Sequence, residues 1–276
     1  MSPPTFDTEP AQAKVERLVA TDSLLARYAG VLLRRANKTA GMEARLTEST
    51  AGLPDFATGH EYFGLHLRDG EWILREWAPH ATAIHLKGPF SDWKATPDYA
   101  LQRGDHGVWE LRLRADALAH GDPYRLEVEW NGGKGDRLPA WVRRVVRDPA
   151  SESFNAEVWQ PTEHYSWRHA SPARPEAPFL VYETHVGMAQ EEPKVGTFAE
   201  FEREVLPRVR DAGYGAIQIM ALAEHPYYAS FGYQVSSFFA ASSRFGTPEE
   251  LKSLVDRAHE MGLLVLMDLV HSHAVR

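Results

Sequence analysis

The sequence predicts a mixed fold with three parts: an N-terminal helix, an antiparallel β-sandwich and the beginning of a parallel α/β architecture. Three changes in the hydrophobic pattern support this prediction. Apolar residues recur at helical spacing before residue 39, alternate with polar residues from Tyr62 to Trp130, and form short continuous runs after residue 178. A chain of 276 residues is long enough for one large domain or two ordinary ones.

The first part is predicted to be helical from residue 11 to residue 38. Its apolar positions recur at spacings of three, four and seven: Val15, Leu18, Val19, Leu25, Tyr28 and Leu32. Thr21, Asp22 and Ser23 compete for backbone hydrogen bonds, so we expect an interruption there. Residues 1–10 are expected to form a frayed tail and residues 39–60, which show no period, a connecting loop.

The second part is predicted to consist of antiparallel strands. Asp69-Gly70 lies between two apolar segments and predicts a tight hairpin, because this dipeptide suits turns whose central residues both need positive φ. Residues 109–113 and 124–130 alternate between apolar and polar side chains, which gives each strand one buried and one solvated face. Several such strands at short spacing indicate a β-sandwich. Residues 148–178 are rich in Pro, Ser and Glu and are expected to be a linker.

The third part contains three apolar runs without alternation, which is typical of strands buried on both faces: PFLVYE, GAIQIM and LLVLMDLV. Capping boxes at residues 197–200 and 247–250 predict the starts of two intervening helices. Gly213 and Gly262 suit the left-handed ends of these helices, and Pro207 is expected to kink or break the first one. Strand and helix alternate, which predicts parallel strands with right-handed crossovers.

These patterns divide the chain into residues 1–60 (tail, helix and loop), 61–150 (β-sandwich), 151–178 (linker) and 179–276 (α/β part). The composition excludes several classes of site. A formal net charge of −8 disfavours binding to nucleic acid through bulk charge, and the absence of cysteine excludes disulfides and thiolate metal sites. No apolar run approaches the ~18 residues of a membrane span, so we expect a soluble, cytoplasmic protein without membrane contact.

The candidate chemistry lies where the predicted parallel strands end, because loops converge there on a rigid backbone. Glycoside chemistry needs two carboxylates across the scissile bond, and Glu183 and Asp268 are one such pair. If the strands follow chain order, however, two ladder spacings separate them by about 10 Å, which is too wide for a retaining mechanism. The favoured interpretation is that each carboxylate hydrogen-bonds to neighbouring groups at the strand ends. The full set of strand-end candidates is Glu183, His185, Glu224, His225, Asp268, His271 and His273.

Two further interpretations remain. His271 and His273 have the H-x-H spacing of a metal site, but a metal needs three or four ligands from several strands. The aromatic loop at residues 227–233 suits sugar rings, whose apolar faces pack on aromatic planes. We expect Tyr227 and Phe231 to belong to the core and Tyr233 to stack on a ligand.

The α/β part resembles the start of the catalytic barrel in starch- and glycogen-branching enzymes, which belong to the α-amylase clan (glycoside hydrolase family 13). The resemblance lies in the segments YETHVGM, YYASFGYQV and SSRFGTPEELKSLVDRAHEMGLLVLMDLVHSHA. Upstream, REWAPHATAIHLKGPFSDWK resembles the carbohydrate-binding module of family 48 that precedes the barrel in these enzymes. The resemblance therefore implies an N-terminal helix, a β-sandwich and the first three strands and two helices of an incomplete (β/α)8 barrel.

The resemblance also assigns roles to residues. It implies that His273 binds the sugar at the cleaved position, that Asp268 supports the site and that Tyr233 stacks on the same sugar. Tyr228 and Gln234 are further candidates for contact with the substrate. No metal or organic cofactor is required by this chemistry.

The family places its nucleophile, its acid/base and its third carboxylate after the fourth, fifth and seventh barrel strands. Only 98 residues run from Phe179 to Arg276, whereas a closed barrel takes ~250. We therefore expect the N-terminal part of a branching enzyme that cleaves α-1,4-glucan (glycogen or starch) and forms α-1,6 branches, and that is catalytically incomplete by itself.

Three alternatives remain open. The chain is a glucan-binding module only, with Trp93 and Arg125 as contacts on the sandwich, or it is another glycoside hydrolase of the α-amylase clan. A metal-dependent hydrolase that uses His271 and His273 is the weakest of the three. The sequence makes no prediction of oligomeric state.

Overall fold

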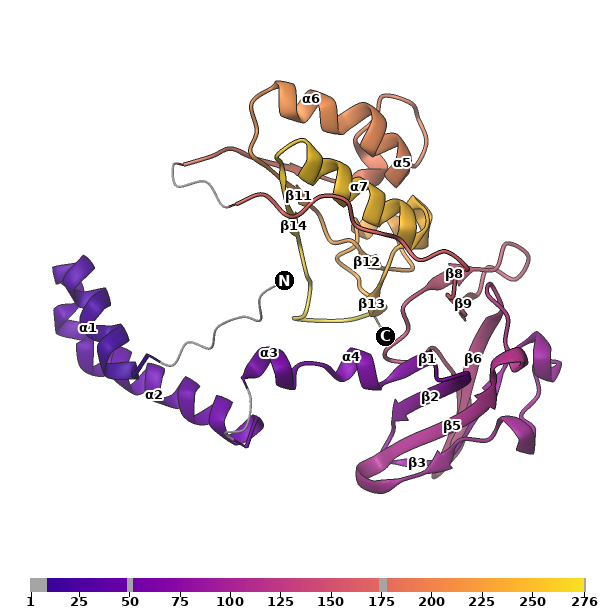
Figure 1. The fold of residues 1–276 in the computed structure, drawn as a ribbon. Coiled ribbons are helices and arrows are strands. Elements are labelled where there is room, and N and C mark those ends of the chain that lie inside the picture. Colours follow the sequence, from indigo (N-terminus) through magenta and orange to yellow (C-terminus); the bar gives the residue numbers. More distant parts are fainter. Residues whose placement is uncertain (1–8, 49–51, 174–177, 276) are drawn as a thin grey trace. The chain divides into compact units, whose positions relative to one another are not determined.

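The computed structural model describes residues 9–48, 52–173 and 178–275. The chain divides into two compact units, residues 1–62 and residues 63–276, and each is described by itself (Figure 1). Most of the tail predicted at residues 1–10 lies outside the described residues. Within them, no helix combines the length and the apolar composition that crossing a bilayer requires.

The first unit is helical. The predicted interruption is confirmed, because Asp22 ends the first helix and its carboxylate accepts a hydrogen bond from the Leu24 amide at 2.9 Å. The loop predicted for residues 39–60 is wrong over residues 39–46, 53–56 and 59–60, which are helical. The second helix continues to Leu46, and the residues of its last turn, 42–46, have good helix propensity. The elements are α1 (Ala11–Thr21), η1 (Ser23–Tyr28), α2 (Ala29–Leu46), α3 (Leu53–Phe56) and α4 (Gly59–Tyr62).

The second unit begins with two antiparallel sheets, as predicted. One has the order β1 (Gly64–Arg68), β2 (Glu71–Trp77), β5 (Val108–Arg114), β4 (Gln102–Arg103). The other has the order β3 (Ala81–Lys87), β6 (Pro123–Trp130), β9 (Phe154–Glu157), β8 (Val145–Arg147), with β7 (Gly133–Arg137) paired to β6.

The details of the sandwich confirm its local signals. Asp69 and Gly70 have φ of 51° and 80°, which forms the predicted hairpin between β1 and β2. The core residues come from both sheets, and the largest of them include Trp72, Leu86, Trp109, Tyr124 and Leu126. Strand β9 corrects the prediction of a linker over residues 148–178. It has four residues and no hydrophobic period, and its pairing with β6 and β8 fixes it in the sheet.

The α/β part confirms the predicted parallel strands. β10 (Val181–Thr184), β11 (Ala216–Ile219) and β14 (Leu264–Met267) pair in parallel in the order β10-β11-β14. Between them lie α5 (Phe198–Glu200), the π-helical turn η7 (Phe201–Val205), α6 (Leu206–Asp211) and α7 (Pro248–Glu260). A short antiparallel pair, β12 (Ala223–Glu224) and β13 (Ser237–Ala241), was not predicted.

The helix signals are confirmed as well. The Thr197 hydroxyl accepts the Glu200 amide at 3.2 Å, and Thr247 does the same for Glu250. Gly213 and Gly262 have φ of 85° and 78°, as expected for left-handed helix ends. Pro207 lacks an N–H to donate, and it is the second residue of α6, which follows directly after the π-helical turn.

Burial of the three parallel strands on both faces was expected, and it holds only for the central strand β11, in which Ala216, Ile217 and Ile219 are completely buried. The helices and the sheet enclose one core, which contains Phe201, Leu206, Ile217, Ile219 and Leu254. At the carboxyl end of β14, however, Leu266 is 40% exposed and Met267 is 51% exposed. The helices cover one side of this three-stranded sheet, and part of its apolar surface stays exposed.

The segment that leaves the sandwich is fastened to α7 through Asp256, which is completely buried. Asp256 accepts hydrogen bonds from the Tyr165 hydroxyl at 2.7 Å, from the Arg168 side chain at 3.0 Å and from the His169 amide at 2.8 Å. Burial by itself raises the pKa of Asp256, but these hydrogen bonds outweigh it and hold the pKa well below its ordinary value. The predicted linker is therefore attached to the α/β part over residues 165–169.

The substitution Asp256→Asn is expected to release this segment. The amide side chain would keep the size of the carboxylate but lose the negative charge that the Arg168 guanidinium contacts. Limited proteolysis should cut residues 160–173 severalfold faster than in the unchanged protein. The matched control is Asp211→Asn at the end of α6, where the carboxylate is exposed. Equal cleavage rates in the two variants would contradict the assignment.

Candidate functional site

Tyr233, Asp268 and His273 form a hydrogen-bonded unit at the carboxyl end of the parallel sheet. The Tyr233 hydroxyl donates to Asp268 Oδ2 at 2.7 Å, and this bond raises the pKa of Tyr233 to about 12. His273 Nε2 lies 2.6 Å from the Tyr233 carbonyl oxygen, and Ser272 Oγ lies 2.9 Å from His273 Nδ1. A neutral His273 with its proton on Nε2 satisfies both contacts, since Nδ1 then accepts from the serine.

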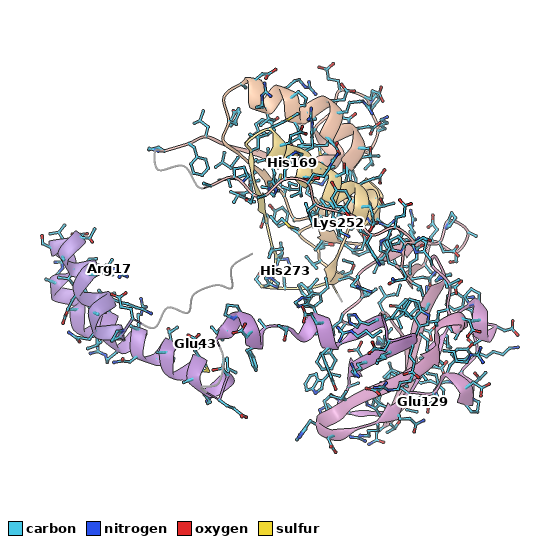
Figure 2. The ribbon with its side chains drawn as sticks, in the orientation of Figure 1. Arg17, Glu43, Glu129, His169, Lys252 and His273 are labelled. Atoms are coloured by element: carbon cyan, nitrogen blue, oxygen red, sulfur yellow. The ribbon has the colours of Figure 1, made fainter. Side chains whose placement is uncertain are left out.

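The surroundings leave this unit accessible. Tyr233 is half-buried, and His273, which is labelled in Figure 2, is exposed, so neither ring lies in a packed interior. The two segments also meet through their backbones, because the Val275 amide donates to the Val235 carbonyl at 2.8 Å. The structure therefore brings together the three residues to which the resemblance assigns roles at the sugar site.

A tight turn presents Tyr233. Phe231 and Gly232 adopt φ of 55° and 91°, and the Tyr233 amide donates to the Ser230 carbonyl at 3.0 Å. A Cβ at Gly232 would lie 1.8 Å from the Ala221 carbonyl oxygen, so only glycine fits there. This close approach brings the loop down onto the end of β11.

The carboxylates at the strand ends have separate partners, as the favoured interpretation expected. Gln218 Nε2 donates to Glu183 Oε1 at 2.8 Å, and Asp268 accepts from Tyr233. Strand β11 lies between the strands that carry these carboxylates, which confirms the chain-order arrangement. Glu183 and Asp268 are therefore not joined in one acid pair.

Glu224 and His225 were candidates for chemistry, and the structure assigns them to the interior. Both residues are completely buried. Glu224 accepts the amides of His225 and Ser243 at 3.0 and 2.8 Å, and Arg244 donates to it at 3.2 Å. His225 Nδ1 lies 2.9 Å from the Ala223 carbonyl oxygen. Sequence reasoning missed this role, because no local pattern distinguishes a buried strand-end carboxylate from an open one.

His185 is also buried and lies in an aromatic cage. The rings of Tyr228, Phe231 and Phe245 meet it edge-on at centroid distances of 5.8, 5.6 and 5.4 Å. Burial lowers the pKa of His185, and the nearby His225 lowers it further. Burial likewise lowers the pKa of His225 and outweighs its hydrogen bond to Ala223. Both imidazoles are therefore neutral near pH 7.

The aromatic loop differs from the prediction at two positions. Tyr227 and Phe231 were expected in the core, but they are 59% and 38% exposed. The short turn at residues 228–230 directs Tyr228 inward instead, where its hydroxyl donates to the Gly187 carbonyl at 3.2 Å. Gln234 is exposed, next to Tyr233. The contacts predicted for Tyr228 and Gln234 with substrate stay predictions.

His271 and His273 do not converge on one point. The His271 ring stacks on Phe238 with centroids 5.6 Å apart, whereas His273 contacts Tyr233 and Ser272. In the part of the chain that the structure describes, no three His, Asp or Glu side chains gather as a metal ion would require. The geometry therefore does not favour a metal site at the H-x-H motif.

The two sandwich candidates lie at the same end of the β3–β6 pair. Arg125 pairs in register with Lys87, and Trp93 follows β3 in a turn where its amide donates to the Gly88 carbonyl at 2.9 Å. Trp93 is exposed, whereas Arg125 donates to Asn155 Oδ1 at 2.7 Å and is half-buried. Their contact with glucan stays a prediction, and Trp93 is the more accessible of the two.

Comparison with protein families gives two matches in the predicted order. Residues 62–151 match "Carbohydrate-binding module 48 (Isoamylase N-terminal domain)", and residues 204–276 match "Alpha amylase, catalytic domain".

The chain is 41% identical over 264 residues to the 1,4-alpha-glucan-branching enzyme of Dictyostelium discoideum, an alignment that covers 94% of this chain and 39% of that protein. It is 42% identical to 1,4-alpha-glucan-branching enzyme 2-2 of Arabidopsis thaliana, covering 94% of this chain and 33% of that protein. The chain thus spans less than two-fifths of the length of these relatives.

Solved structures share the fold at lower identity. A putative alpha amylase from Salmonella typhimurium aligns with a TM-score of 0.64 and 22% identity, covering 78% of this chain and 34% of that one. The group B Streptococcus pullulanase SAP in complex with maltotetraose aligns with a TM-score of 0.65 and 18% identity, with the same coverages. These similarities confirm the predicted combination of a sandwich and a partial barrel.

The neutral histidines predict a pH dependence. Because the folded pKa values of His185 and His225 lie below the ordinary value of about 6.5, their contribution to stability is fully present above pH 6.5 and is lost as the pH falls below it. Urea unfolding should show a lower midpoint at pH 5.5 than at pH 7.5. His185→Phe should reduce this difference, whereas His164→Phe at an exposed position should leave it unchanged. An identical pH dependence in both variants would refute the assignment of His185.

Proposed function

This chain belongs to the family of 1,4-alpha-glucan-branching enzymes, and from that premise we propose that it forms the part of such an enzyme that holds the donor glucan. The observation that carries the proposal is the unit of Tyr233, Asp268 and His273. An accessible aromatic ring lies beside a carboxylate and an imidazole at the carboxyl ends of parallel strands, which is where barrel enzymes bind their substrates.

In the proposed reaction an α-1,4-linked glucan is cleaved and the released chain is transferred to a 6-hydroxyl, which forms an α-1,6 branch. A carboxylate attacks the sugar to form a glycosyl-enzyme, as in retaining hydrolysis, and the acceptor hydroxyl takes the place of water. The resemblance assigns the three reacting acids to later barrel strands, and they have no counterpart among the strand ends described here. The role proposed for Tyr233 and His273 is to orient the donor sugar for attack.

A second proposal concerns the sandwich. Its match to a carbohydrate-binding module and the exposed indole of Trp93 support glucan binding at that surface, independently of the barrel. Another glycoside hydrolase of the α-amylase clan remains an alternative. The identities of 41% and 42% to branching enzymes, against 22% and 18% to the amylase and the pullulanase, favour the branching enzyme.

Glycogen binding tests the sandwich proposal. In native gel electrophoresis, glycogen in the gel should retard the chain, and Trp93→Ala should weaken the apparent affinity about tenfold by removing one stacking platform. Trp167→Ala is the matched control, since this tryptophan is exposed but lies outside the sandwich sheets. Migration that glycogen does not change would count against glucan binding by this chain.

Branching activity tests the barrel proposal. The reading frame beyond the codon for Arg276 should encode an Asp after a fourth strand and a Glu after a fifth. In the complete enzyme, Tyr233→Ala should lower branching of amylose, followed by iodine staining, about 100-fold because the donor sugar loses its orientation. Tyr227→Ala, which removes an exposed ring of the same loop, should change the rate less than about twofold. Full activity of the Tyr233 variant would exclude the proposed role.

A further inference from the structure

Glu224 and Arg244 form an ion pair beneath the loop that carries Tyr233, here called the tyrosine loop (residues 225–236). Arg244 donates to Glu224 Oε1 at 3.2 Å, and the Glu224 side chain is completely buried. Both oxygens of the Glu224 carboxylate accept further hydrogen bonds. Ser242 Oγ donates to Oε1 at 3.1 Å, and the amide and hydroxyl of Ser243 donate to Oε2 at 2.8 and 3.1 Å.

Glu224 contacts both ends of the tyrosine loop, and Arg244 adds contacts at its start. At its start, the His225 amide donates to the Glu224 carboxylate at 3.0 Å, and Arg244 donates to the carbonyls of His225 and, at 2.7 Å, of Pro226. At its end, the amide and hydroxyl of Ser236 donate to the Glu224 carbonyl at 2.8 and 3.0 Å. Glu224 thus holds the start of the loop through its carboxylate and the end of the loop through its backbone carbonyl.

This closure determines where Tyr233 lies. Between its two ends, the loop contacts the sheet where Gly232 meets Ala221, and Tyr233 then reaches Asp268 at 2.7 Å. Asp268 follows β14 and is bonded through its own amide to the Ile219 carbonyl at 3.1 Å. A loop released at residues 225 or 236 would keep its turn but would no longer hold the tyrosine ring at a fixed place over Asp268.

Glu224 is not suited to react with a substrate itself. Both of its carboxylate oxygens accept hydrogen bonds from protein groups, and no part of its side chain is exposed. A carboxylate removed from water needs such compensation, and loss of one partner would leave the other charge buried and unpaired. The pair therefore acts through the loop that it holds.

We propose that Glu224 and Arg244 are positioning residues, which fix the tyrosine loop so that Tyr233 meets the donor sugar in one orientation. This inference rests on the proposed function, since both assume that Tyr233 contacts the donor sugar. It predicts that the effects of Glu224 and Tyr233 on branching are coupled, because the first residue acts through the second.

A double-mutant cycle in the complete enzyme tests the coupling. Glu224→Gln keeps the size of the side chain, removes its charge, and should lower kcat/KM for amylose about 100-fold, as Tyr233→Ala does. The double variant should be no worse than the more severe single variant, because the second change removes nothing that is still in place. Two independent losses would multiply to about 10,000-fold, and that result would overturn the proposal.

Two further variants separate positioning from general destabilisation. Leu254→Ala truncates a buried side chain of α7 in the core, so its effect should combine multiplicatively with that of Tyr233→Ala. Arg244→Lys keeps the charge and should recover part of the activity lost in Arg244→Ala. If Glu224→Gln does not fold, Ser243→Ala removes a single hydrogen bond to the carboxylate, and its smaller effect should still be non-additive with Tyr233→Ala.

Hydrogen exchange of the 276-residue chain distinguishes failure of this proposal from failure of the proposed function. In Glu224→Gln, amides of residues 227–236 should exchange at least about tenfold faster, whereas those of β5 should stay unchanged. Unchanged exchange in the loop would overturn the positioning role, whatever the activity. If exchange in the loop is faster in Glu224→Gln but the complete enzyme without substitutions does not branch amylose, the proposed function is rejected. The role of Glu224 in holding the loop would then still be established.

Discussion

The candidate site depends on the parallel register of β10, β11 and β14. Thr184 pairs with Ile219 and Ile219 pairs with Met267, so three strands end at the same level although they are far apart in the sequence. The segments that follow these ends carry the tyrosine loop and the stretch from Asp268 to Val275. A slip of one residue in either pairing would turn alternate side chains to the opposite face and would separate Tyr233 from Asp268.

Local signals predicted most of the fold. The capping boxes at Thr197 and Thr247, the turn at Asp69-Gly70 and the glycines after the helices each specify their structure through neighbouring residues, and all are confirmed. The elements that were missed lack such signals. Strand β9 and the strands β12 and β13 are only two to five residues long and are fixed by partners distant in the sequence. Strands this short show no hydrophobic period from which they could be predicted.

The site was predictable only where a local sequence motif marks its residues. Tyr233, Asp268 and His273 were found through motifs that resemble a known family, and in the structure Asp268 and His273 each lie within hydrogen-bonding distance of Tyr233. The interior role of Glu224 and the exposure of Tyr227 were not predictable, because burial depends on which distant segments cover a residue. Ser242, Ser243 and Arg244, which surround Glu224, lie eighteen to twenty residues further along the chain.

Three carboxylates near the ends of neighbouring strands show how surroundings decide the role of one chemical group. Glu183 is exposed and bonds to Gln218 on the next strand, which aligns two adjacent side chains. Glu224 is enclosed and paired with a guanidinium, so its charge serves to hold backbone in place. Asp268 is half-buried and bonds to the Tyr233 hydroxyl at 2.7 Å. Glu183 and Asp268 are both ordered by one hydrogen bond, but only the partner of Asp268 is an accessible aromatic ring, so Asp268 is the carboxylate that can help to position a ring for a sugar.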